Sequence, residues 1–382
     1  MKVAVVGSGI GGLAAAIGLQ RAGAEVTVVE QSADLRPHGS GLSIFGNGLR
    51  ALDALDLGAD FRAISTAQAA ELTGGQRRPD GSWVSVYPMD AVAQLRIVDR
   101  ADLHAMLTAA LAPGTVRSGA PVTGCSPDGT LSVAGREDER FDVIIGADGL
   151  RSTVRTAWPA DPGIRYAGYG SWRGITQQPV ELHGEAGETW GVDTRFGLAP
   201  LGDGRVYWFG VIGAPAGRRF SADRQAVAAV FADWHAPIPG LIAATNPAAI
   251  SYLPIEELAG RLPSFVRGRI VLLGDAAHAM TPNLGQGGNQ ALEDAATLTR
   301  LLAPLTAADA HDTGRLIVAL DRYDALRRPR TQQVAARSRL VGQIAHRPGP
   351  QLSRLRDRLM HLIPASVPRR QLDALQDWQP PA

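Results

Sequence analysis

Three short glycine-containing segments, far apart in the chain, constrain the fold more than any other feature. They occupy residues 6–12 (Val-Gly-Ser-Gly-Ile-Gly-Gly), 146–149 (Gly-Ala-Asp-Gly) and 274–278 (Gly-Asp-Ala-Ala-His). Each directly follows a run of aliphatic residues, which is typical of a buried parallel strand that ends in a tight turn. One such segment alone is weak support. Three in this order predict an open α/β fold that binds a ligand where its strands end.

The first segment has the spacing of a phosphate-binding turn. Residues 2–6 form its aliphatic run, and Gly7, Gly9 and Gly12 match the G-x-G-x-x-G pattern. We predict that Gly7 allows the tight turn, Gly9 lets a pyrophosphate touch the backbone, and Gly12 lets the next helix pack closely. Residues 13–21 indicate that helix, whose N-terminus offers unpaired N–H groups and about half a positive charge to phosphates.

A carboxylate follows the second predicted strand, at residues 26–29. Glu30 lies 18 positions after Gly12, close to the ~20 expected for the acid that binds a ribose. We expect Glu30 to accept hydrogen bonds from ribose hydroxyls and to disfavour a 2′-phosphate. An ordinary βαβ unit with a glycine-rich turn is the alternative. A secretory signal in the apolar stretch 3–19 is disfavoured by its glycines and by the strand that ends at Glu30.

The second and third segments repeat the arrangement of a strand and an acid-containing turn. Residues 141–145 lead into one, and residues 269–273 lead into the other. A glycine-rich loop at 281–289 and a predicted helix at 290–302 follow the third segment. This combination suits a polar ligand chain that ends in an electron-rich group. The alternative, three unrelated strand–turn–helix connections, requires three coincidences in order.

On these motifs the chain resembles the class A flavoprotein monooxygenases, which have the p-hydroxybenzoate hydroxylase fold. The resemblance runs from residue 1 to about residue 329. It implies an α/β protein with a Rossmann-like FAD-binding domain, a mixed β-sheet substrate domain and C-terminal helices. It also implies a tightly and non-covalently bound FAD, with NAD(P)H as a transient co-substrate and O2 as the oxidant.

The same resemblance assigns cofactor contacts. By it, Glu30 and the three glycines of the first motif hold the adenosine end of FAD, and Asp275 takes a ribityl hydroxyl. Asp148 and Gly149 are similar to the family's Asp-Gly pair, which touches the pyrophosphate side and is associated with the nicotinamide donor. Arg100 resembles the arginine that reaches the flavin tail. A surface arginine at a helix start is the alternative for Arg100.

The loop at 282–289 has a physical role of its own. A helix that starts near its end points its positive end at the N1–C2=O edge of a flavin, where the reduced ring carries negative charge. Glycines in the loop let the ring approach the backbone without Cβ clashes. The expected contacts are Pro282, Gly285, Gly287, Gly288 and Asn289. We expect His278 to pack beneath the cofactor as a structural residue and not to act as a base.

Two strands, 195–201 and 205–211, indicate a hairpin. A three-residue loop with Gly204 in a left-handed conformation would pair Ala199 with Tyr207 and put Arg195 and Tyr207 on one face of the sheet. A two-residue loop would instead put Trp208 beside Arg195, because a one-residue slip exchanges the faces. We favour the three-residue loop.

Arg195 and Tyr207 are therefore the candidate catalytic residues. A guanidinium and a phenol on one wall suit a flat substrate that is anionic or bears a carbonyl. The two positions are similar to the pair that lines the pocket of FAD-dependent urate hydroxylases. The strings around them also resemble salicylate-hydroxylase-like and zeaxanthin-epoxidase-like members. In the alternative, Arg195 is a surface residue and Tyr207 a core residue.

Shifts in composition divide the chain. A turn-rich stretch at 74–90 reads as a hairpin of a second sheet, and most aromatic residues fall between 166 and 257. We expect an FAD-binding domain at 1–73, 95–172 and 264–345, a substrate-binding sheet at 74–94 and 173–263, and a C-terminal tail at 346–382. Residues 313–345 are predicted to be helical. The tail is predicted to hold one further helix with a proline-rich end.

Bulk properties fit a cytoplasmic enzyme without nucleic-acid or membrane partners, as a monomer or homodimer. The net charge is +1, so no preference for nucleic acid follows. Cys125 is the only cysteine, which excludes an intrachain disulfide, and we find no 20-residue apolar span. No metal site is expected.

The resemblance implies that NAD(P)H reduces FAD, that O2 adds at flavin C4a, and that the hydroperoxide hydroxylates an aromatic or heteroaromatic small molecule. An epoxidase, oxidase or reductase of the same fold, acting on a non-aromatic substrate, is the main alternative, and a flavin-binding regulator is another. A flavin halogenase is rejected because it needs a lysine by the substrate, whereas Lys2, the only lysine, lies in the first strand. A two-dinucleotide disulfide reductase is rejected because no second G-x-G-x-x-G follows a strand.

Overall fold

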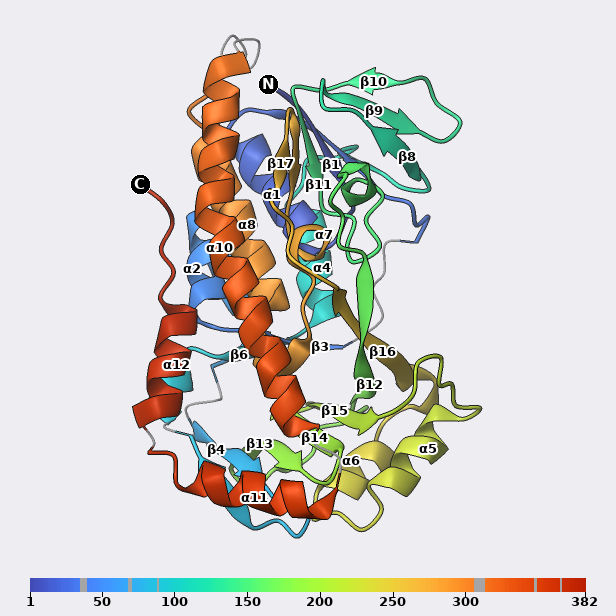
Figure 1. The fold of residues 1–382 in the computed structure, drawn as a ribbon, viewed down its shortest axis with the longest axis vertical. Helices are drawn as coiled ribbons and strands as arrows, with labels where there is room; N and C mark the ends of the chain where they lie inside the picture. Colours follow the sequence, from blue (N-terminus) through green and yellow to red (C-terminus); the bar gives the residue numbers. More distant parts are fainter. Residues whose placement is uncertain (35–39, 68–70, 88, 306–312, 347–348, 365) are drawn as a thin grey trace.

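A computed structural model describes the chain except for residues 35–39, 68–70, 88, 306–312, 347–348 and 365 (Figure 1). At one end lies a six-stranded sheet in the order β17-β18-β11-β1-β2-β7, parallel except for the β17–β18 pair. Its strands are β1 (Lys2–Val6), β2 (Glu25–Val29), β7 (Val116–Arg117), β11 (Val143–Gly146), β17 (Val266–Arg267) and β18 (Ile270–Leu272). The strands that precede the three glycine motifs, β18, β11 and β1, are neighbours, so the motifs meet at one edge of the sheet.

Two helices, one that begins at the first motif and one that follows the loop after the third, pack against each other. They are α1 (Ile10–Arg21) and α8 (Gly287–Leu302). Small residues on α1 allow the close approach: a Cβ on Gly11 would lie 3.0 Å from Ala291 Cβ, and one on Gly18 would lie 2.5 Å from Thr299 Oγ1. The long helix α10 (Thr313–Ala345) lies beyond α8 and reaches down to the second lobe (Figure 1).

The second lobe is built on a seven-stranded sheet in the order β16-β12-β15-β14-β13-β4-β5. Its strands are β4 (Thr73–Arg77), β5 (Trp83–Val86), β12 (Ile164–Ile175), β13 (Glu185–Trp190), β14 (Thr194–Pro200), β15 (Val206–Gly213) and β16 (Ser251–Leu258). Trp172, Phe196 and Trp208 are buried on its outer face against α5 (Asp223–Val230) and α6 (Ile238–Ala243). Because side chains alternate along a strand, the intervening residues face the cofactor lobe.

The predicted hairpin at 74–90 is confirmed as β4 and β5, and it belongs to this second sheet. The predicted domain boundary at residue 172 falls inside β12. That strand pairs with β16 from Ile164 onward and with β15 from Tyr169 onward. The division into domains stays a prediction, and β12 crosses it.

Smaller elements complete the fold. They are a three-stranded sheet of β8 (Val122–Cys125), β9 (Thr130–Val133) and β10 (Glu139–Arg140), the pair β3 (Gly41–Ile44) and β6 (Arg96–Asp99), and the helices α2 (Gly46–Ala54), α3 (Gly58–Ala63) and α4 (Arg100–Ala109). Asp99 caps α4 by accepting a hydrogen bond from the Ala101 N–H at 3.0 Å. Among the described residues, no helix is both long and apolar enough to cross a bilayer.

The C-terminal tail contains two helices, α11 (Pro350–His361) and α12 (Ser366–Gln376). The prediction of a single helix there is wrong. Pro364 lies in the break, and its ring disfavours a helical conformation at the preceding residue while removing one backbone donor. Figure 1 shows α11 running beneath the second sheet and α12 returning toward the cofactor lobe.

Candidate active site

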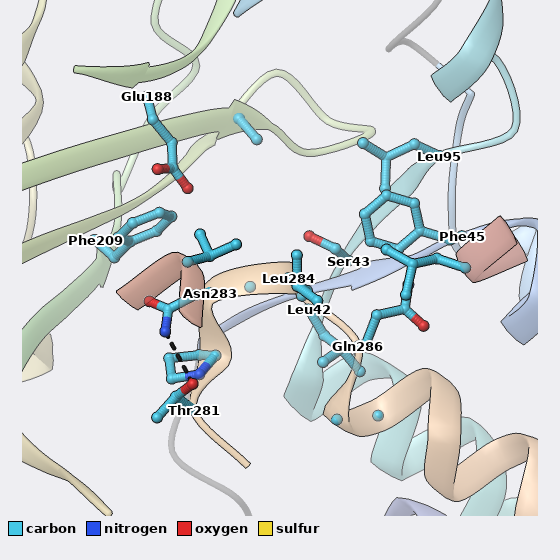
Figure 2. Close-up of a pocket in the computed structure, with 18 of the residues that line it drawn as sticks. Leu42, Ser43, Phe45, Leu95, Glu188, Phe209, Thr281, Asn283, Leu284 and Gln286 are labelled. Carbon is cyan, nitrogen blue, oxygen red and sulfur yellow. Dashed lines mark hydrogen bonds between the residues drawn. The ribbon is translucent and has the colours of Figure 1, made fainter. Parts of the chain in front are cut away.

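A cavity of about 1660 Å³ is lined by residues from the turns that follow the first sheet, from the second sheet and from the C-terminal helices. All three glycine motifs contribute to its wall. So does the inner face of the second sheet, through Arg195, Tyr207 and Phe209. Figure 2 shows Glu188 and Phe209 projecting from that sheet toward the loop that carries Asn283 and Leu284. The cavity therefore lies where a ligand can meet both lobes.

The glycines form a cradle with space above it. A Cβ built on Gly9, Gly149 or Gly287 would meet no atom within 4 Å, and all three residues line the cavity. Gly7 and Gly12 act differently. A Cβ on Gly12 would lie 2.2 Å from Gly7 O, and Gly7 has a φ of +102°, so these two residues allow the turn and the close helix. This geometry fits an extended FAD.

Two charged side chains face the same groove. Arg100 and Asp275 line the cavity and are exposed, and neither side chain has a hydrogen-bond or ion-pair partner among the described residues. Asp275 begins α7 (Asp275–His278), directly after Gly274, whose φ of +59° favours glycine. A free guanidinium and a free carboxylate beside the glycine cradle suit the phosphates and hydroxyls of FAD.

Two predicted contacts instead bond to the protein. Glu30 Oε2 accepts from the Ser8 N–H at 2.8 Å and the Ser8 hydroxyl at 2.9 Å, and its Oε1 accepts from the Ser32 N–H at 2.8 Å. Asp148 accepts from the Ser152 hydroxyl and from the Val154 N–H at 3.1 Å. Burial raises the pKa of Asp148. Both carboxylates organise the turns of their own motifs.

The predicted loop and helix start are present. The short 3₁₀ helix η5 (Pro282–Leu284) leads to Gly285, which is left-handed with a φ of +62°, and α8 begins at Gly287 as predicted. Asn289 is fully buried and ties the loop to β3. Its amide accepts from the Phe45 N–H at 2.9 Å and donates to Ser43 O at 2.9 Å.

Nine of the predicted cofactor residues line the cavity: Gly9, Gly12, Arg100, Gly149, Asp275, Pro282, Gly285, Gly287 and Gly288. Four do not, within the described part of the chain: Gly7, Glu30, Asp148 and Asn289. The roles of all thirteen toward FAD stay predictions.

The predicted hairpin register is confirmed. Arg195 pairs with Val211 and Ala199 with Tyr207, so Arg195 and Tyr207 share one face of the sheet. The loop has three residues, and Gly204 has a φ of +82°. The alternative register with Trp208 beside Arg195 is excluded, because Trp208 is buried on the other face.

Arg195 is a buried cation with free donors. Its side chain is 3% exposed, and its Nη2 donates to Asn283 Oδ1 at 2.8 Å. Its Nη1 lies 3.5 Å from Glu188 Oε2, and its Nε and Nη1 make no hydrogen bond. The guanidinium also lies 5.7 Å from the centre of the Phe209 ring. Buried donors without partners are costly, so a ligand acceptor is expected there. Arg195 is not a surface residue.

Tyr207 packs against the backbone of β3. A Cβ on Gly41 would lie 2.1 Å from Tyr207 Cγ, so glycine is required for this contact. Burial raises the pKa of Tyr207. The phenol is therefore neutral near pH 7 and can donate a hydrogen bond.

Sequence reasoning missed the residues behind Arg195. Asn283 Nδ2 donates to Tyr169 Oη at 2.8 Å, and the Tyr169 ring stacks on His346 with centroids 4.2 Å apart. The His346 side chain is 5% exposed and its two ring nitrogens make no hydrogen bond, and burial together with Arg195 lowers its pKa to about 3. These residues come from distant segments: Asn283 stood in the glycine-rich loop, Tyr169 in a string similar to the urate hydroxylases, and His346 in no motif.

His278 has the structural role expected of it. Its Nε2 lies 2.6 Å from Asp294 Oδ2, and the ring is buried. Arg327 donates to Asp294 Oδ1 at 2.6 Å. This network joins α7, α8 and α10 beneath the glycine loop.

Comparison with known proteins identifies the family. The FAD binding domain family matches residues 1–338. The chain is 36% identical over 376 residues to aurachin C monooxygenase/isomerase from Stigmatella aurantiaca, covering 95% of this chain and 94% of the relative. It is 31% identical over 385 residues to the FAD-dependent urate hydroxylase of Klebsiella pneumoniae, covering 92% of each.

A solved structure agrees. The crystal structure of Klebsiella pneumoniae HpxO complexed with FAD and uric acid superposes with a TM-score of 0.84 at 27% identity, covering 99% of this chain and 96% of that one. With matches over nearly its whole length, the chain belongs to the FAD-binding family of class A aromatic monooxygenases.

Proposed function

We propose that this monooxygenase hydroxylates an aromatic or heteroaromatic ring that presents a carbonyl or anionic oxygen to Arg195. The observation that carries the proposal is the pair of unpartnered donors, Nε and Nη1, on a buried guanidinium in the cavity wall. Arginine donates charge-assisted hydrogen bonds to carbonyl and anionic oxygens, and each of these two nitrogens can donate one. Phe209 and the neutral phenol of Tyr207 add a flat apolar surface and one further donor.

The cradle residues are proposed to hold FAD. Gly9 and Gly149 bring the backbone to the pyrophosphate and Gly12 lets α1 pack closely, while Arg100 and Asp275 bind phosphate and hydroxyl groups. FAD, when bound, supplies oxygen activation with electrons from NAD(P)H. The N-terminus of α8 favours negative charge at the ring edge. The remaining proposed contacts are Gly7, Glu30, Asp148, Pro282, Gly285, Gly287, Gly288 and Asn289.

Water exclusion is a second requirement of this chemistry. Residues of α10, α11 and α12 line the cavity and extend its wall beyond the two sheets. Arg195 holds the polar edge of the substrate, and the apolar wall covers the rest. This fixes the ring against the flavin without a side-chain nucleophile.

The test uses FAD-loaded enzyme with a panel of hydroxybenzoates and purines. NAD(P)H oxidation should rise with the correct ring, and the product should gain one oxygen atom that derives from ¹⁸O2. Arg195→Met should raise KM by about 10- to 100-fold, because one hydrogen bond to a charged group is worth about 1.5–3 kcal/mol. Arg195→Lys should recover only part, since it lacks the fork. Ligand-independent oxidation, or a product without added oxygen, would support a same-fold oxidase or reductase instead.

Assembly and location belong to the same proposal. We propose that the chain works as a monomer or homodimer in the cytoplasm on a small-molecule substrate. Light scattering of the purified enzyme measures the first point, and fractionation of the producing cell measures the second.

A further inference from the structure

The cavity has a polar end and an apolar end. The polar end holds Arg195, Glu188 and Asn283. The cavity is also lined by apolar residues of β5, α10, the α11–α12 connection and α12, beside polar ones such as Arg337 and Gln371, and we call the part that these apolar residues line the apolar arm. The arm residues used below are Val86, Leu340, Ile344, Ile363 and Val367.

The apolar arm opens to solvent. Its five residues line the cavity and are also among the exposed large hydrophobic residues: Val86 is 48% exposed, Leu340 56%, Ile344 37%, Ile363 49% and Val367 39%. An apolar cluster that lines the cavity and is also exposed marks an opening of the cavity, which we call the mouth. Leaving such side chains in water costs free energy that an apolar ligand recovers when it covers them.

Hydrogen bonds hold the elements around the mouth together. Arg356 of α11 donates to Ala345 O at the end of α10 at 3.0 Å, and the His361 ring lies 3.3 Å from Val84 O of β5. Arg369 of α12 pairs with Asp90, which follows β5, at 2.7 Å. The arm is therefore bounded by several attached elements and is not a frayed tail.

We propose that the apolar arm binds an aliphatic chain carried by the aromatic substrate. The inference rests on the proposed function, because the ring of the same molecule lies at Arg195. The chain would run from the ring between α10 and the C-terminal helices to the mouth. The substrate class is thus an amphiphilic aromatic compound, with a polar ring edge at one end and a hydrocarbon tail at the other.

The experiment measures Kd from the perturbation of the flavin spectrum of the FAD-loaded enzyme. The probes are phenol and 4-alkylphenols with two to ten carbons in the chain. Burial of each methylene is worth about 0.8 kcal/mol, so Kd should fall about fourfold per carbon until the chain reaches the mouth. A Kd independent of chain length would overturn the proposal.

Two variants separate the arm from general hydrophobic binding. Ile344→Arg puts a charge in the arm and should flatten the dependence on chain length while leaving the Kd of phenol within about twofold. Val318→Arg is the matched control on the same helix, 68% exposed and outside the cavity lining, and should keep the wild-type dependence. Equal dependence in Ile344→Arg and Val318→Arg would also overturn the proposal.

The proposed function can fail separately. Hydroxylation is read from products and from NAD(P)H consumption, whereas the chain-length dependence needs only binding. Chain-dependent binding without any oxygenated product would refute hydroxylation of these rings and retain the arm. Hydroxylation of a ring without a chain, together with a Kd that does not depend on chain length, would support the proposed function and refute the apolar arm.

Discussion

Arg195 and Asn283 join the two walls of the cavity: the guanidinium on β14 donates to the amide oxygen of the loop before α8 at 2.8 Å. The same amide donates to Tyr169 Oη on β12 at 2.8 Å and to Ser338 O on α10 at 2.9 Å. The Asn283 side chain thus fixes the Arg195 guanidinium relative to the loop before α8. This relationship supports the first prediction.

Asn283→Leu should lower the free energy of unfolding by about 1–3 kcal/mol, because it leaves buried polar partners unsatisfied. It should also weaken substrate binding, because Arg195 loses its support. Asn283→Asp is the informative companion. Its carboxylate can still accept from Arg195 but partly neutralises it, so an anionic ring should lose more affinity than a neutral carbonyl-bearing ring. Flavin-monitored titration with both ring types measures this difference, and equal losses would contradict the assigned role of Arg195.

Gly342 of α10 should not tolerate alanine. A Cβ there would lie 2.5 Å from Asn283 Nδ2 and 2.6 Å from Tyr169 Oη. Alanine normally stabilises a helix interior by up to about 1 kcal/mol relative to glycine. We expect Gly342→Ala to gain nothing and to raise KM by displacing Asn283. Gly240→Ala in α6 is the control, because its Cβ meets no atom within 4 Å. A Gly342→Ala variant with wild-type KM would show that the contact relaxes freely.

His346 should make stability sensitive to mild acid. Burial and Arg195 lower its pKa to about 3, against an unfolded value of about 6.5. Below pH 6.5 the unfolded chain binds a proton that the folded chain does not, so stability falls by up to about 1.4 kcal/mol per pH unit toward pH 3. His346→Phe keeps a ring against Tyr169 and removes this titration. The melting temperature of this variant should change less than that of the wild type between pH 7.5 and pH 5. Asp193, whose Oδ1 lies 3.8 Å from Nδ1, favours the protonated ring, but burial and Arg195 outweigh it.

Asp294 acts in the same sense, but in a lower pH window. Burial raises its pKa, but His278 and Arg327 outweigh burial and lower it to about 2. Because this is below the unfolded value of about 3.9, its contribution is complete above about pH 4 and is lost as pH falls through 2. Asp294→Asn should cost about 3 kcal/mol at pH 7, since it removes one partner of a buried cation. Denaturant unfolding measures the loss. Asp53→Asn, in an exposed pair with Arg62, should cost less than about 1 kcal/mol.

The sequence predicted the parts of the site that depend on local rules. Strand-then-glycine motifs placed the cradle, and alternation along a hairpin put Arg195 and Tyr207 on one face. The stacking of Tyr169 on His346 could not be predicted in this way, because the residues are 177 positions apart and no spacing rule relates them.

The orientation of the C-terminal helices could not be predicted from the sequence either. α11 buries Arg356 and Asp357 while Leu355 and Leu359 are about half exposed, which inverts the usual amphipathic pattern. Arg356 pairs with Asp357 and reaches Ala345 O, so tertiary contacts decide which face turns inward. Periodicity alone assigns the opposite face, and it gives no sign that this helix walls the cavity.

β12 runs for 12 residues, with β16 along one edge and β15 along the other. The Leu258 N–H at the end of β16 bonds to Ala279 O, beside the α7 turn, at 3.1 Å. Backbone hydrogen bonds along β12, β15 and β16 therefore link the substrate lobe to the cofactor lobe. The two lobes cannot move apart without breaking these bonds. Substitutions on the inner face of the second sheet can change which substrate binds. The position of the oxygenating group relative to that substrate is set by the backbone.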